Sequence, residues 1–245
     1  MSNMSRRELF QSAIPVAFSA SAMNSKILEA HLLPNASADA RSEESRADEG
    51  VTAPEDLMRE HGVIRRSFLI YDAVAARLEN GESVPLKQLR STAELFRHFG
   101  EQYHEHSEEI GVFPVLKKAG KHVRMVQVLL DQHKRGRQIT DYILGVSKSG
   151  SLSADHKQAL AQQLRNFSRM YANHAAREDT IIFPALREVL GPKGIDELGD
   201  RFEAEEKRIL GEGGFEHGVA RVGEIEAAFG LADLAQFTPP APPKS

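Results

Sequence analysis

The chain of 245 residues contains no cysteine, which excludes disulfides, thiol catalysis, zinc–thiolate sites and cysteine-ligated iron–sulfur clusters. It also lacks a basic excess, because 31 Lys and Arg face 35 Asp and Glu, so binding along a nucleic-acid backbone is not expected. No apolar run approaches the roughly 20 residues that cross a bilayer, so no stable membrane insertion is expected. A hydrophobic content of 41% excludes disorder throughout. Because cysteine is absent, any bound metal must be held by His, Asp or Glu.

Residues 1–22 have the parts of an export signal: a charged start, a short apolar segment and the small residues Ala-Ser-Ala at 20–22. The adjacent Arg6 and Arg7 resemble a twin-arginine signal. Cleavage after residue 22 would leave Met23 as the first residue of a periplasmic protein. The alternative is a frayed N-terminal helix with a chance arginine pair on a cytoplasmic protein.

The composition divides the rest of the chain into three parts. Residues 23–52, rich in Ser, Ala, Asp and Glu, are expected to form a disordered spacer. Residues 238–245 contain four prolines and are expected to be a disordered tail. Residues 53–237 remain, which is the length of one ordinary domain.

Apolar residues between 53 and 230 recur at spacings of three and four, which predicts helices and no strand. The first long helix is expected to end at Asn80 and Gly81, the second to begin at Pro85, the third to span about 122–144, and the fourth to follow Ser153 and close at Gly191. Shorter helices are expected near 195–210 and 215–229. The sequence therefore predicts an all-α, up-down-up-down four-helix bundle with one or two extra C-terminal helices.

Polar residues fall within the apolar stripe of each long helix. On the second helix Glu108 follows His104 by four residues, so both side chains lie on one face. The fourth helix repeats this spacing, and the first and third helices each place one histidine in the stripe. The set is His61, His104, Glu108, His133, His174 and Glu178.

A single histidine in such a stripe is more often a hydrogen-bonded core residue, but here an internal repeat adds weight. The spacings from His104 to Glu108 and onward to Phe113, Pro114 and Leu116 recur without change in His174, Glu178, Phe183, Pro184 and Leu186. Two buried carboxylates without partners would cost several kcal/mol each. Buried pairing is the alternative, but a pair of metal ions explains why six polar groups converge.

Ligand chemistry narrows the metal. Imidazole and carboxylate without thiolate suit iron, manganese or zinc. Glu108 and Glu178 are expected to bridge two ions, as in di-iron helical bundles. One ion would take His61 and His104, and the other the two remaining histidines. About four protein ligands per ion would leave open positions, which favours a reactive site over a structural one.

The motifs resemble those of the hemerythrin-like, or HHE cation-binding, family over roughly residues 53–237. The matching pieces are Glu60-His61, Tyr103-His104 through Glu108-Glu109 to Phe113-Pro114, Gln132-His133 through Gly136-Arg137, and Asn173-His174 through Glu178 to Phe183-Pro184. The resemblance implies a bundle with two non-haem iron ions that binds or reacts with dioxygen, nitric oxide or peroxide.

The chain departs from the oxygen-carrying hemerythrins, which have a fifth histidine where this sequence has Arg137. Four histidines and two glutamates look more like the iron–sulfur-cluster repair branch, although the Cys-bearing N-terminal domain of many of those proteins is missing. Three interpretations stay open: a di-iron protein that binds or responds to small ligands, a di-iron enzyme of the peroxidase or nitric oxide reductase type, and an inert metal-storage or structural module. No redox partner can be identified.

Other polar residues near the six are expected to have lesser roles. Glu109 and Asp179 would point away and make capping or loop contacts. Tyr103 and Tyr171 would pack in the core or donate a hydrogen bond to a bound oxygen species. The remaining histidines are expected at the surface or behind the ligands: His98, His106, His122, His156 and His217.

Overall fold

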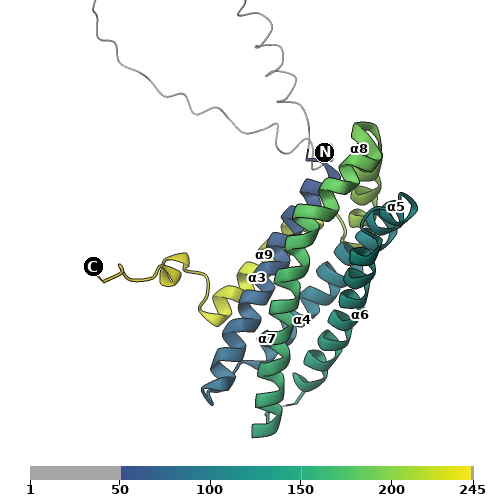
Figure 1. The fold of residues 1–245 in the computed structure, drawn as a ribbon. Helices are drawn as coiled ribbons and strands as arrows, with labels where there is room; N and C mark the ends of the chain where they lie inside the picture. Colours follow the sequence, from purple (N-terminus) through teal and green to yellow (C-terminus); the bar gives the residue numbers. More distant parts are fainter. Residues whose placement is uncertain (1–50, 150, 244–245) are drawn as a thin grey trace, which may run out of the picture. The chain divides into compact units, whose positions relative to one another are not determined.

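The computed structural model describes residues 51–149 and 151–243, and helices cover nearly all of that span, without any strand (Figure 1). The α-helices are α3 (Ala53–Glu79), α4 (Leu86–Leu95), α5 (Phe113–Lys118), α6 (Val123–Val146), α7 (Ala154–Arg177), α8 (Phe183–Leu210) and α9 (Gly214–Phe229). Three π-helical segments, η2 (Phe96–Glu105), η3 (Glu108–Val112) and η4 (Glu178–Ile182), and one 3₁₀ turn, η5 (Leu234–Phe237), lie between or after them. The all-α prediction is confirmed.

The predicted export signal at 1–22 and nearly all of the predicted spacer at 23–52 lie outside the described residues. Both stay predictions. Of the Pro-rich tail, residues 238–243 are described and form neither helix nor strand. Within the described residues, no helix combines the length and the apolar character that a membrane crossing requires.

Most of the predicted helix boundaries agree with local chemistry. Ser153 caps α7, its hydroxyl accepting a hydrogen bond from the backbone N–H of His156 at 3.3 Å. At Gly191, expected to close the fourth helix, the backbone leaves the helical conformation, with φ 65° and ψ 177°. Glycine adopts this conformation readily, and Pro192 after it cannot donate a backbone hydrogen bond, so the pair interrupts the helix. The label α8 therefore covers two helical stretches on either side of this kink, and the second is the helix expected near 195–210.

The backbone around the two glutamates is π-helical, where the sequence predicted a regular α-helix. In both halves the backbone N–H five residues after the glutamate donates to its carbonyl: Phe113 to Glu108, and Phe183 to Glu178. A proline follows each phenylalanine, and a proline ring clashes with the carbonyl four residues earlier in an α-helix. The wider π turn relieves that clash, and such turns occur frequently at functional sites.

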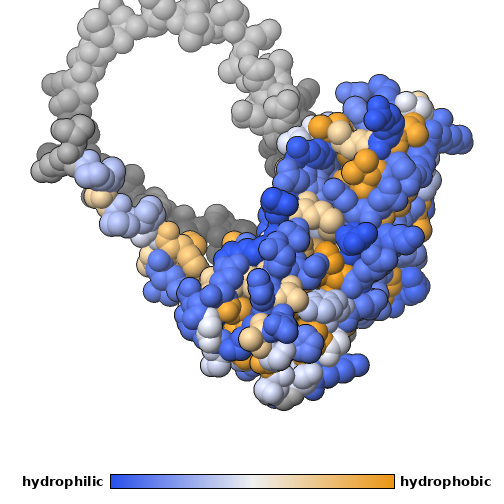
Figure 2. Space-filling view, turned by 60° about the horizontal axis from the view of Figure 1, so that its bottom comes forward, coloured by the Kyte–Doolittle hydropathy of each residue, from blue (hydrophilic) through white to orange (hydrophobic). Residues whose placement is uncertain are grey.

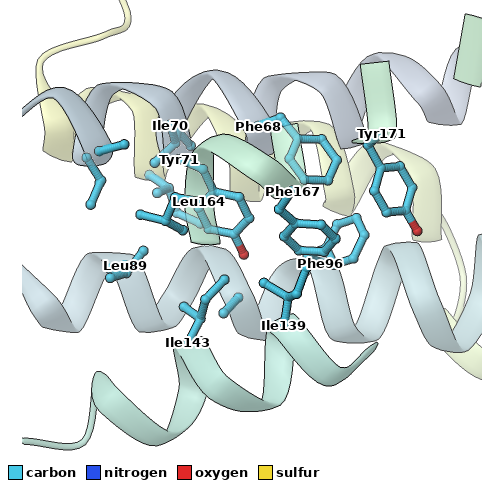
Figure 3. Packing of buried hydrophobic residues seen from close by; sticks show 14 of the residues in the cluster. Phe68, Ile70, Tyr71, Leu89, Phe96, Ile139, Ile143, Leu164, Phe167 and Tyr171 are labelled. Atoms are coloured by element: carbon cyan, nitrogen blue, oxygen red, sulfur yellow. The ribbon is translucent and has the colours of Figure 1, made fainter. Parts of the chain in front are cut away.

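The helices pack as a bundle, with α3 lying against α7, α8 and α9, and α4 against α6 and α9. Its core consists of two hydrophobic clusters. One contains Phe68, Tyr71, Phe96, Phe167 and Tyr171 (Figure 3), and the other Leu57, Leu129, Phe113, Phe183 and Phe202. In sequence order, each of His61, His104, His133 and His174 falls between residues of one cluster and residues of the other. Polar residues cover most of the face shown in Figure 2.

Phe167 tests the packing of the aromatic cluster. Its ring is fully buried and lies 5.0 Å from the ring of Phe68 and 5.3 Å from that of Phe96, centroid to centroid. Phe167→Ala should lower the free energy of unfolding by about 3–5 kcal/mol, measured by urea denaturation. The control Phe237→Ala removes a ring that is 57% exposed and should change stability by less than about 0.5 kcal/mol. Equal effects would contradict this core.

Candidate metal centre

The structure brings together all six residues that the sequence singled out. They come from α3, η2, η3, α6, α7 and η4, and each side chain is at most 2% exposed. Ligand atoms of Glu108, His133, His174 and Glu178 lie within 4.8 Å of one another, as do those of His61, His104 and Glu108. The two groups share a glutamate, so they form one continuous cluster.

Each glutamate has one carboxylate oxygen near a histidine of the first group and its other oxygen near a histidine of the second group. The distances to histidine Nε2 atoms are 3.6 Å for Glu108 Oε1 to His104, 3.5 Å for Glu108 Oε2 to His133, 2.9 Å for Glu178 Oε1 to His174, and 3.4 Å for Glu178 Oε2 to His61. Both carboxylates therefore span the cluster in the same manner.

The histidines are arranged as two pairs. The ring centroids of His61 and His104 are 4.7 Å apart, and those of His133 and His174 are 4.8 Å apart. In the second pair the Nε2 atoms approach to 3.1 Å. These are the pairs into which the sequence divided the four histidines.

The outer nitrogen, Nδ1, of every histidine faces a side-chain oxygen. The Nδ1 to oxygen distances are 2.7 Å for His61 to Asp179, 2.8 Å for His104 to Glu60, 2.9 Å for His133 to Glu109, and 2.9 Å for His174 to Gln132. A carboxylate or amide oxygen can only accept, so each Nδ1 carries the proton and donates it. In the neutral ring this leaves the Nε2 lone pair free and turned toward the cluster.

When both glutamates are ionised and the imidazoles are neutral, the inward-facing atoms are all acceptors: four Nε2 atoms and four carboxylate oxygens. The oxygens of Glu108 and Glu178 are buried and accept no hydrogen bond of normal geometry from the described residues. Acceptors buried together in this way are unfavourable by several kcal/mol unless a positive charge lies among them. The donor set, nitrogen and carboxylate oxygen without sulfur, therefore fits a metal ion.

Burial also acts on the charges of the cluster. Desolvation and the neighbouring Glu178 raise the pKa of Glu108 well above its usual value, whereas the adjacent His174 holds the pKa of Glu178 low in spite of burial. Desolvation lowers the pKa of His104 well below its ordinary value and that of His133 to about 4. These two imidazoles are therefore neutral near pH 7, which is the protonation state that metal binding requires. Burial also acts to lower the pKa of His61, but its contacts with Asp179 and Glu178 outweigh burial and raise that pKa.

Glu109 and Asp179 do not make the capping or loop contacts expected of them. Besides His133, Glu109 accepts a hydrogen bond from Arg137 Nη2 at 2.6 Å, and Asp179 pairs with Arg65 in addition to its histidine. Although burial raises the pKa of Glu109, these two donors bring it down to about 2. In both halves the residue directly after the buried glutamate thus contacts the Nδ1 atom of a histidine, and it does so within a π-helical segment.

The sequence contains a pattern that indicates these contacts. Arg65 and Arg137 each stand four residues after a lone histidine, and the polar Glu60 and Gln132 each stand directly before one. Polar residues at matching positions of a repeat indicate a shared contact. Tyr103 is also explained, since its hydroxyl donates to Glu60 Oε1 at 2.8 Å.

The remaining candidates lie outside the cluster or at its edge. The Tyr171 hydroxyl is buried without a hydrogen-bond partner among the described residues, and its ring lies 5.1 Å from that of His174. Of the other histidines in the described residues, His106 is half-buried and the remaining four are exposed: His98, His122, His156 and His217.

The buried charge of Glu105 has no counterpart in the other half of the repeat. Arg137 also pairs with Glu105, at 2.9 Å, and Glu105 is completely buried. In the other half, Arg65 corresponds to Arg137, but the position that corresponds to Glu105 holds Ala175. Arg137 therefore pairs with two carboxylates, those of Glu105 and Glu109, whereas Arg65 pairs with the carboxylate of Asp179.

A layer of buried imidazoles and carboxylates inside a helical bundle defines a cation-binding protein. The family profile of the hemerythrin HHE cation-binding domain matches residues 52–186 and, in a second match, 124–212. The chain belongs to this family. The second match begins 72 residues after the first (52 against 124), which is also the separation of His61 and His133. The family match thus follows the internal repeat.

The chain is also similar to uncharacterized proteins of Mycobacterium bovis and of two strains of Mycobacterium tuberculosis. Each is 44% identical over 190 residues, which cover 77% of this chain and 74% of the relative. No solved structure matches the chain significantly. These relatives are described as uncharacterized, so the similarity assigns no activity to the chain.

The pseudo-symmetric arginines provide a matched test of the buried charges. Arg137→Ala should lower the free energy of unfolding of the metal-free chain by about 1–3 kcal/mol more than Arg65→Ala does, because it leaves Glu105 buried without a cation. Urea denaturation of both variants measures the difference. Equal losses would show that Glu105 does not depend on Arg137.

Proposed function

We propose that the bundle binds two non-haem iron ions, with Glu108 and Glu178 bridging them. One ion takes His61 and His104, and the other the histidine pair of α6 and α7. The observation that supports this proposal is the placement of both carboxylates, since each directs one oxygen to one pair of histidines and its other oxygen to the other pair. The ligand set would also suit manganese or zinc.

The protein's role at this centre is to fix the ligands and to exclude water. The acceptors at Nδ1 hold each imidazole in one orientation, which strengthens its binding to a metal. The two hydrophobic clusters close the layer on both sides. We infer that the four ligand-bearing segments follow an up-down-up-down order, as in other di-iron helical bundles.

Two histidines and two bridging carboxylates give each ion four protein ligands. This leaves coordination positions for an exogenous ligand, which is the property of a reactive site. Iron, when bound, would supply the affinity and the electrons for a small oxidising ligand. We therefore propose that the protein binds or responds to dioxygen, nitric oxide or peroxide.

Metal content and visible absorption test the proposal directly. Protein expressed in iron-supplemented cells should contain about two irons per chain, with absorption bands that shift when dioxygen, nitric oxide or peroxide is added. Turnover of peroxide or nitric oxide with a reductant would identify an enzyme instead of a binding protein. One zinc per chain, or spectra unchanged by every ligand, would contradict the proposal and favour a structural or storage module.

Single substitutions test the bridging role. Glu108→Ala should remove most of both irons, because a bridging ligand belongs to both ions, whereas His61→Ala should mainly weaken one. Iron per chain, measured by elemental analysis after desalting, gives the comparison. His98→Ala, in η2 like His104 but exposed, is the control and should keep both irons. Equal losses from Glu108→Ala and His61→Ala would refute the bridge.

A further inference from the structure

We propose that the two ion positions differ in affinity, and that Glu60 makes the position at His61 and His104 the tighter one. This inference rests on the two-ion centre proposed above. It concerns the residues behind the ligands, where the two halves of the bundle are not alike.

Most of the support for the ligands is the same in both halves. The lone histidines, His61 and His133, each donate Nδ1–H to a carboxylate that is itself paired with an arginine. These carboxylates belong to Asp179 and Glu109, the residues directly after the two bridging glutamates. This part of the site gives no reason for the two positions to differ.

The other two histidines are supported differently. His104 donates Nδ1–H to the carboxylate of Glu60, while His174 donates to the amide oxygen of Gln132. Glu60 and Gln132 stand at equivalent positions, each directly before a lone histidine. The halves therefore place a charged acceptor behind one imidazole and a neutral acceptor behind its counterpart.

A charged acceptor changes the imidazole it supports. A hydrogen bond to a carboxylate is about twice as strong as one to a neutral oxygen, and it raises the basicity of the nitrogen that binds the metal. His104 should therefore be a stronger ligand than His174. Glu60 is held in this role, because it is buried and its second oxygen accepts the hydroxyl of Tyr103.

One feature acts in the opposite direction. Glu105 adds a buried carboxylate on the side of His133, and its ion pair is with Arg137. If charge at a distance decided the affinities, Glu105 would strengthen the position that Gln132 leaves weak. A variant at Glu105 therefore separates a field effect from the effect of the hydrogen bonds.

The inference is tested by titrating the metal-free full-length chain with cobalt(II) and monitoring binding by calorimetry and visible absorption. The unsubstituted chain should bind two ions in distinguishable steps. Glu60→Gln should weaken the tight step about 10–100-fold, and Gln132→Glu should strengthen the weak step by a similar factor. Both substitutions keep the size of the side chain, and circular dichroism confirms that each variant is folded.

Further variants assign the steps and control for charge. His61→Ala should weaken mainly the tight step, and His133→Ala mainly the weak one. Glu94→Gln, an exposed glutamate of α4, should leave both steps unchanged. Glu105→Gln should leave the tight step tight; if it alone reverses the order of the steps, the field of the buried charges decides affinity and the role of Glu60 is overturned.

The outcomes also separate this inference from the proposed function. Two equal steps in the unsubstituted chain, or no response of the weak step to Gln132→Glu, would overturn the inference and leave the two-ion centre standing. Binding of fewer than two ions by the folded chain would overturn the two-ion centre, and the inference with it.

Discussion

The site depends on four hydrogen bonds, each from the Nδ1–H of a buried histidine to a side-chain oxygen. These bonds decide which ring nitrogen carries the proton. If Nε2 carried it, the histidines could donate to Glu108 and Glu178, and the cluster would satisfy itself. Because Nδ1 carries it, acceptors face acceptors in a buried space. Folding and cation binding are therefore linked, since an ion that binds the folded chain also relieves its least favourable contact.

The rest of the bundle serves this layer. Apolar clusters on both sides keep water away, so the acceptors cannot be satisfied by solvent. In the π turns before Phe113 and Phe183, two successive acidic residues both contact the histidines of the cluster. Glu108 faces the Nε2 atoms, while Glu109 reaches the Nδ1 atom of His133 from behind.

The six inward residues could be predicted because a repeat places them at fixed spacings on apolar stripes. The contacts of Glu109 and Asp179 could not, because periodicity arguments assume a regular helix and the π turn breaks the assumption. The helix break at Gly191 could also be predicted, because glycine readily leaves the helical conformation and Pro192 has no backbone N–H to donate. Glu60 was visible only as part of a motif, since its role appears when α3 lies beside η2.

A repeated hairpin would by itself give two equivalent halves, and the ligands, their lone-histidine supports and the arginines do follow that symmetry. The differences lie one residue away from a ligand: Glu60 against Gln132, Tyr103 against Asn173, and Glu105 against Ala175. None of these changes alters the set of ligand atoms. They alter hydrogen bonding and charge behind the ligands, which tunes a metal without changing its coordination. A symmetric set of candidate ligands can thus have unlike surroundings in the two halves of the bundle.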